Sequence, residues 1–214
     1  MMMEDAGLKK SEEEVIVLDF LPNGHPFKPP RIPIAQVLGK RFLTLLEVIP
    51  KKGVFLRTGE RAYIGNGKRE EIHHVKGKIK YDDLTNTGKQ ELDVVLKKLV
   101  EEKEKTFVNF MNKSIPLTTR LHQLELIPGI GKKHMFKILD ERRFKPFESF
   151  KDMRERVELL PDIKQSIIKR IIIELNEEDK YRIFTNFDYG PSERSKEPEE
   201  TTTDSPQDET QKLE

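Results

Sequence analysis

The chain has 214 residues, of which 39 are Lys or Arg, 38 are Asp or Glu and none is Cys. The length allows one or two domains with a hydrophobic core, and the absence of cysteine excludes disulfides and cysteine-ligated zinc. No apolar run approaches the roughly 18 to 20 residues that cross a bilayer, and no signal-peptide pattern follows the start, so we expect a soluble, cytoplasmic protein.

The net charge of +1 conceals an uneven distribution of charge along the chain. Residues 15–190 contain 34 basic and 25 acidic side chains, a net charge of +9, whereas residues 191–214 contain 3 basic and 8 acidic ones. A basic body favours polyanionic partners whose binding weakens steeply with salt, although a lysine-rich solvated surface has the same composition. We expect residues 1–13 and the Ser-, Thr-, Pro- and acid-rich residues 190–214 to be disordered.

Short strands are predicted in the first part of the chain. Val15–Phe20 is an apolar strand that ends at the turn Pro22-Asn23-Gly24, and His25–Pro33 holds four prolines, which favour an extended connector. Arg41–Pro50 is rich in leucine and β-branched residues and is predicted to be a long buried strand, continued by another over Gly53–Arg57.

A hairpin is predicted next. Arg61–Gly65 alternates, with Ala62 and Ile64 facing a core, and Asn66-Gly67 is typical of a tight turn that would lead to a return strand over Lys76–Tyr81. Several short strands with hairpin turns indicate a small curled β-domain over residues 14–84, similar to an OB- or S1-like β-barrel.

This β-domain contains a candidate binding surface. Residues 51–80 hold 9 basic and 3 acidic side chains. Cations interleaved with aromatic rings suit a single nucleic-acid strand, since every base has a π-face and every linkage has a charge. The candidate contacts are Lys51, Lys52, Arg57, Arg61, Lys68 and Arg69, with Tyr63 and Phe55 as stacking platforms. Core packing is the alternative for both rings, and we favour it for Phe55.

The pattern then changes to helical. Apolar residues recur with a period of about 3.6 and charged residues fill the positions between them, which predicts an amphipathic connecting helix over residues 85–113 that allows for a bend. Its apolar positions are Leu92, Val95, Leu96, Leu99, Val100, Phe107, Phe110 and Met111. Near the end of the body, Tyr181–Phe184 reads as a final short strand that packs back.

A short pattern occurs twice in the last third of the chain. Leu126–Gly131 is matched 33 residues later by Leu159–Lys164. The apolar positions of the following helix repeat as well, because Met135, Ile138 and Leu139 align with Ile168, Ile171 and Ile172. We interpret the pair as a duplicated helix–turn–helix unit.

Only the first copy of the turn has kept its glycines. Gly129 and Gly131 permit an open turn whose following helix directs free N–H groups and its positive dipole end outward, which suits a phosphate oxygen, and Lys132 and Lys133 follow at once. In the second copy Asp162 would repel an anion, so we expect that turn to be structural.

Residues 114–185, and Leu117–Leu175 in particular, resemble a tandem helix-hairpin-helix domain, which holds a sugar-phosphate backbone without reading bases. The resemblance implies that Gly129-Ile130-Gly131 contacts the backbone and that Ile130 is buried between the helices. The alternative is that the Pro-Gly-Ile-Gly sequence is only a tight helix connection.

No catalytic site is predicted. The adjacent His73 and His74 would point to opposite faces of a strand and would not converge on a metal ion. The sequence has no Ser-His-Asp pattern, zinc-protease motif or nucleotide-binding glycine fingerprint. We therefore expect a non-enzymatic protein with no cofactor and no metal.

The combined pattern resembles an archaeal family of predicted RNA-binding proteins that is catalogued as a domain of unknown function. Gly59–Gly65, the basic segment after it and Leu126–Lys133 carry the resemblance. It implies a nucleic-acid partner, with RNA favoured over DNA and no membrane. A DNA repair or junction-binding protein is one alternative, and an adaptor that contacts proteins of translation, transcription or repair is another.

Overall fold

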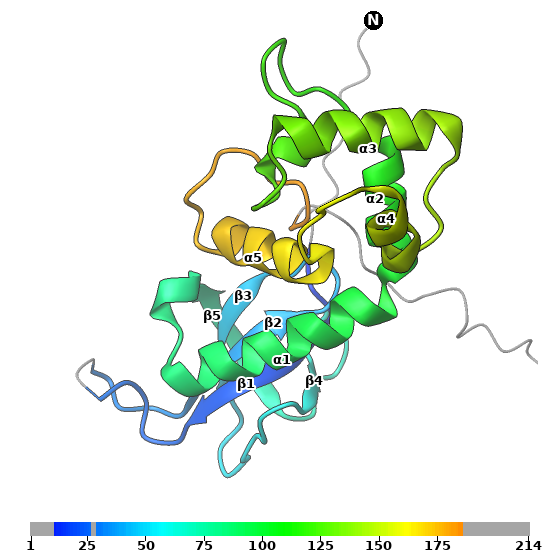
Figure 1. The fold of residues 1–214 in the computed structure, drawn as a ribbon. Helices are drawn as coiled ribbons and strands as arrows, with labels where there is room; N and C mark the ends of the chain where they lie inside the picture. Colours follow the sequence, from blue (N-terminus) through cyan, green and yellow to red (C-terminus); the bar gives the residue numbers. More distant parts are fainter. Residues whose placement is uncertain (1–10, 27–28, 186–214) are drawn as a thin grey trace, which may run out of the picture.

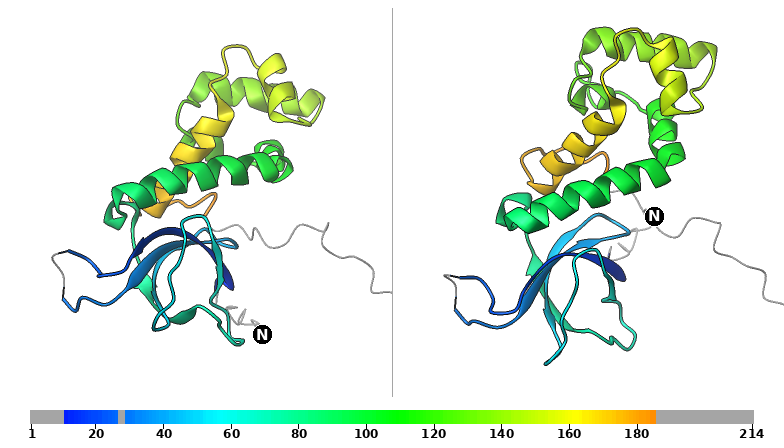
Figure 2. Two further views of the ribbon diagram at one scale, coloured as in Figure 1. Left: turned by 90° about the horizontal axis from the view of Figure 1, so that it is seen from below. Right: turned by 60° about the horizontal axis from the view of Figure 1, so that its bottom comes forward.

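The computed structural model describes residues 11–26 and 29–185, so the predicted disorder of residues 1–10 and 190–214 lies outside the described residues. For Glu12 the predicted disorder is wrong, because its side chain is buried and its carboxylate accepts the backbone N–H groups of Arg41, Phe42 and Thr44. The first half forms a curled, five-stranded sheet in which every neighbouring pair is antiparallel, in the order β4-β1-β2-β3-β5. Its strands are β1 (Glu14–Leu21), β2 (Ile34–Gly39), β3 (Leu45–Pro50), β4 (Arg61–Tyr63) and β5 (Ile72–Lys78). Figure 2 shows the curl of the sheet.

The structure confirms some of the predicted strands and corrects others. β1 and the turn after it agree with the prediction, and Ala62 and Ile64 are buried. β2 was not predicted, β3 is shorter than the expected strand, and residues 53–57 form no strand.

The hairpin predicted at Asn66-Gly67 is wrong. β4 pairs with β1 and β5 pairs with β3, so the two strands that flank this turn occupy opposite edges of the sheet. The turn residues therefore belong to a connection across the open side of the sheet.

The second half is helical, and two short 3₁₀ helices accompany the α-helices. The 3₁₀ helices are η1 (Tyr81–Asp83) and η2 (Gln123–Leu126). The α-helices are α1 (Asn86–Glu102), α2 (Glu104–Lys113), α3 (Lys132–Phe144), α4 (Phe150–Arg156) and α5 (Ile163–Leu175). The predicted connecting helix is thus bent, at Lys103, into α1 and α2.

Helix α1 joins the two halves. Figures 1 and 2 show it lying between the sheet and the other helices. One continuous cluster of buried side chains extends from Leu18 and Leu45 of the sheet through Leu96 of α1 to Ile171 of α5. The start of α1 is also fixed to the sheet, because the Gln36 side chain accepts a hydrogen bond from the Thr85 backbone N–H at 2.9 Å. The halves therefore share one core.

Two helix–turn–helix units stand side by side, η2 with α3 and α4 with α5. Met135 and Ile138 are buried and Leu139 is half-buried, and the aligned residues Ile168, Ile171 and Ile172 repeat this order. The predicted repeat of apolar positions is therefore confirmed at the level of packing.

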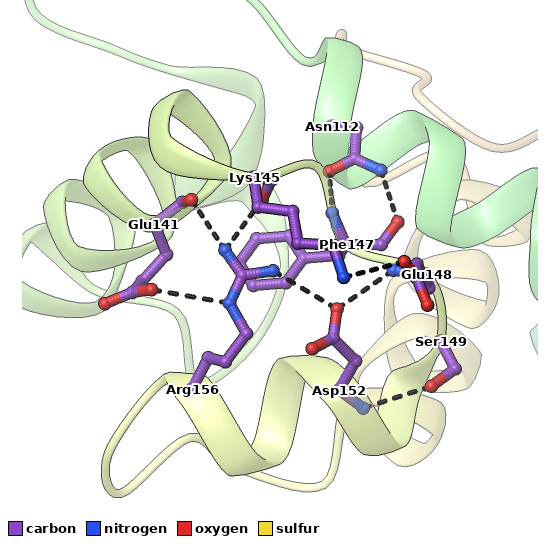
Figure 3. A network of polar contacts seen from close by, with 8 residues as sticks. All are labelled: Asn112, Glu141, Lys145, Phe147, Glu148, Ser149, Asp152 and Arg156. Carbon is purple, nitrogen blue, oxygen red and sulfur yellow. Dashed lines mark hydrogen bonds and ion pairs between the residues drawn. The ribbon is translucent and has the colours of Figure 1, made fainter.

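Arg156 ties the end of α3 to α4. Its guanidinium donates to the Glu141 backbone oxygen and to the Lys145 backbone oxygen, both at 2.6 Å, and to Asp152 Oδ2 at 3.2 Å, while it lies 4.4 Å from the centre of the Phe147 ring. Figure 3 shows this arrangement from close by. Together with the contact of Arg156 Nε with Glu141 Oε2 at 3.4 Å, these contacts of one planar cation fix the connection between the two units.

The segment after α5 packs back on the body, as predicted, but not as a strand. Ile183 and Phe184 are buried, and the Phe184 ring meets the ring of Phe107 edge-on at 5.4 Å. The buried Glu174 carboxylate holds this segment, because it accepts the backbone N–H groups of residues 183, 184 and 185. Arg170, at 2.9 Å, balances the charge of Glu174.

Candidate nucleic-acid interface

The first turn is built around a glycine that no other residue replaces without strain. Gly129 has φ +89°, and a Cβ placed on it would lie 3.2 Å from Pro161 of the second unit. Ile130 follows it, with 3% of its surface exposed, and donates its backbone N–H to the Ile127 carbonyl at 3.0 Å. The burial expected for Ile130 is confirmed, and it turns the neighbouring backbone outward.

Helix α3 begins directly after this turn with no side chain capping it. Gly131 is the N-cap residue, and a Cβ built on it would meet nothing within 4 Å. The backbone N–H groups of Gly131, Lys132, Lys133 and His134 have no acceptor within the described part of the chain. The uncapped first turn of a helix carries a partial positive charge.

The two lysines of this turn add full charges to the partial one. Lys132 and Lys133 are exposed, and neither forms an ion pair with any residue of the ranges 11–26 and 29–185. The turn therefore combines open space, unsatisfied donors and two cations, which is a favourable environment for an anionic oxygen.

The second turn is closed by its own side chain. Asp162 Oδ1 accepts the backbone N–H groups of Lys164 at 3.0 Å and Gln165 at 3.3 Å. Helix α5 starts at Ile163, which aligns with Ile130, so it begins two residues earlier than α3. The sequence-based expectation that this turn is structural agrees with its capped geometry.

His134 is a residue of the first turn that the sequence reasoning missed. Its Nδ1 lies 3.2 Å from the Gly129 carbonyl oxygen, so the ring links the third residue of α3 to the turn before it. A histidine three residues after the Gly-Ile-Gly sequence was the available signal, although only the fold shows the contact.

His122 and Arg142 stabilise the first helix–turn–helix unit through hydrogen bonds to the backbone. His122 Nδ1 accepts the Leu124 backbone N–H at 3.1 Å and caps η2, while Arg142 donates to the backbone oxygens of Met111 and Ser114, each at 2.8 Å. Burial lowers the pKa of His122, and the charge of Arg142 lowers it further. Burial likewise lowers the pKa of Arg142.

The structure brings some of the basic candidates of the sheet together. The Lys51 ammonium donates to the Arg69 backbone oxygen, and Arg69 Nε donates to the Gly65 carbonyl at 2.9 Å. Lys52, Arg57 and Lys68 are exposed, and no ion pair involves them within the described ranges.

Arg61 has an acidic neighbour. It is exposed on β4 and lies near Glu14 of β1, whose pKa is held low by the hydrogen bond from Lys40 and by the charges of Lys40 and Arg61. Part of the positive charge expected on this side of the sheet is therefore neutralised.

The two aromatic candidates differ in exposure. The ring of Tyr63 is half-buried over Gly65 and Gly67, and its hydroxyl accepts the Gly67 backbone N–H at 3.1 Å. Tyr63 thus supports its own loop, and stacking on a base remains a prediction for it. Phe55 is 76% exposed, so the preference for core packing at Phe55 was wrong.

The two histidines of β5 are also placed differently from the prediction. His73 Nδ1 and His74 Nδ1 lie 2.6 Å apart, so the rings converge instead of pointing to opposite faces. The cause is a β-bulge, since Ile49 pairs with His74 and Pro50 pairs with Ile72, which leaves His73 as the extra residue. No group of three or more His, Cys, Asp or Glu residues suited to a metal occurs in the described ranges.

Over residues 11–26 and 29–185, fold and site together define a mixed α/β protein with a curled antiparallel sheet, five α-helices and, at α3, a helix start that has no side-chain cap and is followed by two lysines. Within the residues that the structure describes, no helix has the length and apolar character to cross a membrane.

Residues 11–186 match the family model described as "Protein of unknown function (DUF655)". The chain belongs to this family. It is 48% identical over 184 residues to "Uncharacterized protein MJ0038" of Methanocaldococcus jannaschii, covering 85% of this chain and 83% of that protein. The crystal structure of Af1531 from Archaeoglobus fulgidus is similar with a TM-score of 0.72 and 43% identity, over 81% of this chain and 99% of that one. Both relatives are archaeal proteins.

Proposed function

We propose that this protein binds nucleic acid without catalysing a reaction, and that RNA is its ligand. In this proposal the turn from Gly129 to Lys133 holds a phosphate of the backbone, and the basic residues of the sheet guide the adjoining strand. The proposal includes the finer interpretation of the two helix–turn–helix units as a tandem helix-hairpin-helix domain and of the sheet as OB-like.

The uncapped start of α3 is the observation that carries this proposal. Four consecutive N–H groups, from Gly131 to His134, face no acceptor in the described chain, while the equivalent start of α5 is satisfied by Asp162. In the free protein these N–H groups are hydrogen-bonded to water, so leaving them uncapped costs little free energy. When a phosphate binds, each hydrogen bond from an N–H group or a lysine to its charged oxygens contributes about 1.5 to 3 kcal/mol.

The charge of the body supports a polyanionic ligand. Residues 15–190 carry a net charge of +9, and Lys52, Arg57 and Lys68 on the sheet are exposed without ion-pair partners in the described ranges. Two binding surfaces on one body reinforce each other if one ligand reaches both.

The comparison of the two turns favours a single-stranded ligand over a duplex held symmetrically. A duplex gripped by both units would use two equivalent open turns, but Asp162 closes the second one. Proteins recognise RNA largely at unpaired segments, which is why we place RNA before DNA. A DNA repair or junction-binding role and a protein adaptor role are the alternatives that experiment has to exclude.

The test is the double variant K132E/K133E, assayed for binding to single-stranded RNA, duplex DNA and branched DNA at matched salt. We expect its affinity for RNA to fall at least tenfold and the slope of log affinity against log salt to become shallower by about one unit or more. The matched control is K98E/K105E, which makes the same change of charge on exposed lysines of α1 and α2.

Three outcomes would contradict the proposal. Equal affinity of the two double variants would remove the first turn from the interface, and tighter binding of branched DNA than of RNA would favour the junction-binding alternative. The absence of any nucleic-acid binding, combined with protein capture that survives nuclease treatment, would favour the adaptor.

A further inference from the structure

The loop between β3 and β4 presents one large aromatic side chain to solvent. Phe55 is 76% exposed, although its neighbour Val54 is half-buried and its other neighbour Leu56 is 5% exposed. A ring of this size normally contributes most when it is buried. Its exposure between two inward-facing residues indicates that the loop holds it outward.

The loop is fastened to the sheet on both sides of Phe55. On one side, the Lys51 backbone N–H donates to the Glu71 carbonyl, next to the start of β5, at 2.8 Å, and the Val54 backbone N–H closes a turn onto the Lys51 carbonyl at 3.1 Å. On the other side, the Gly59 N–H donates to the Val17 carbonyl and the Val17 N–H donates to the Glu60 carbonyl, both at 2.8 Å. The side chain is therefore presented by an anchored backbone.

The ring of Phe20 packs against the ring of Phe55. The rings of Phe20 and Phe55 meet edge-on, with centres 5.9 Å apart and planes at 84°. An edge-on neighbour supports one side of the Phe55 ring and leaves its face available for stacking. Tyr63 is half-buried against its own loop, so less of its ring is open to solvent than of the Phe55 ring.

Cations stand on either side of Phe55 along the loop. Lys52 and Arg57 are exposed, and no acidic side chain pairs with either one in the described ranges. The acidic residue of this loop is Glu60, whose carboxylate accepts the Arg57 backbone N–H at 2.9 Å and is therefore turned toward the backbone.

We propose that Phe55 is a stacking platform for an unpaired nucleobase and that Lys52 and Arg57 bind the phosphates on either side of that base. This inference rests on the proposed function and deepens it, since stacking on Phe55 requires a base free of its partner and so selects single strands over duplexes.

The β3–β4 loop and α3 lie far apart on the molecule. Figures 1 and 2 show the β3–β4 loop and α3 at opposite ends of the molecule, with the rest of the sheet and α1 between them. Site sizes of single-strand-binding folds range from about 4 to about 16 nucleotides, and the longer the strand, the more readily it engages both surfaces. The contribution of Phe55 is therefore measured with short and long strands.

The first experiment uses a fluorescent replacement of the ring. The chain contains no tryptophan, so F55W introduces a single indole at this position. We expect an oligo-uridine RNA to quench its fluorescence and an abasic strand of the same length and charge to leave it unchanged. Equal responses to the two strands would overturn the inference.

The second experiment measures affinity. We expect F55A to bind the short oligo-uridine about tenfold more weakly than the wild type and to bind the abasic strand equally well. The control is F144A, which removes a ring that is 90% exposed at the end of α3 and should change neither affinity. Unchanged unfolding midpoints verify that both variants are folded.

The outcomes separate this inference from the proposed function. If RNA binding is lost in K132E/K133E but is unchanged in F55A, the turn binds backbone and the stacking platform is wrong. If the wild-type protein binds neither the oligo-uridine RNA nor the abasic strand, both the proposed function and the stacking platform are wrong. If F55A impairs capture of a protein partner but not of RNA, Phe55 serves a protein interface and the inference is likewise overturned.

Discussion

The two turns of the duplicated unit share the same pattern of buried apolar residues, but the first leaves its backbone N–H groups uncapped and the second has a side-chain cap. Ile130 and Ile163 are each 3% exposed and begin equivalent runs of buried residues. After Ile130 the chain reaches an uncapped helix start at Gly131, whereas Ile163 is already helical and its helix is capped by Asp162. Duplication preserved the packing, and the difference at one glycine position decided whether backbone donors remain available.

This difference shows how a helix start is kept open. A residue with φ +89° cannot continue into a helix, so α3 begins two residues later than α5 does, and the N–H groups from Gly131 to His134 have no acceptor in the described residues. Asp162, with φ −62°, adopts the ordinary conformation of a cap and satisfies two N–H groups at once.

The largest effect is expected when the open turn is given a cap. In G131D the new carboxylate would accept the N–H groups of α3, because Gly131 has the extended backbone of an N-cap residue. We expect folding to be stabilised by roughly a few tenths of a kcal/mol while affinity for RNA falls by roughly ten- to a hundredfold. Urea unfolding and RNA titration of the same preparation measure the two changes, and a variant that gains stability without losing affinity would contradict our interpretation of the turn.

A smaller effect is expected from removing the unusual conformation. G129A places a Cβ at positive φ and 3.2 Å from Pro161, so we expect a loss of about 1 to 2 kcal/mol in the free energy of unfolding. G77A is the control, because Gly77 has no positive φ and the space beside it is open. Equal stability of the two variants would show that the turn relaxes.

The closed turn should respond in stability alone. In D162A the start of α5 loses its cap, and we expect the free energy of unfolding to fall by about 1 kcal/mol with affinity for RNA unchanged. D162N, which retains a capping oxygen, should restore most of the stability. A clear gain or loss of RNA affinity in D162A would mean that the second turn also contacts the ligand.

The smallest effect concerns pH and the support of the open turn. Since burial lowers the pKa of His122, the unfolded chain takes up a proton at higher pH than the folded one does. Stability from this group is fully present above the unfolded pKa of about 6.5 and is lost as pH falls through the lower folded pKa. In H122N the dependence of the urea midpoint on pH between about 7 and 5 should be shallower than in the wild type, and an identical dependence would exclude His122 as its source.

The helical half was predictable to a large extent because its signals are local. Helical period and glycine placement predicted the amphipathic helix and the repeat of apolar positions, while the purely structural role of the second turn stays a prediction. The pairing of strands is different, since it depends on contacts between residues far apart. β2 was missed because all six of its residues are buried, so its sequence shows no alternation, and Gln36 interrupts the apolar run.

Details of the candidate site also depended on the fold. The bulge that brings His73 beside His74 arises from the register of β5 against β3, which no local pattern reports. The exposure of Phe55 follows from the anchoring of Leu56 and Gly59 on the sheet, whereas its apolar neighbours in sequence favoured a buried interpretation.

The continuous core through α1 has a practical consequence for work with fragments. Leu92 and Leu96 of α1 belong to the same buried cluster as Leu18 of the sheet and Ile167 of α5, so a cut on either side of α1 would expose apolar surface on both products. We expect calorimetry of the intact chain to show a single heat-absorption peak. The spacing between the Phe55 loop and the Gly129 turn is then a fixed property of the body, and under the proposed function it would favour strands long enough to span that spacing.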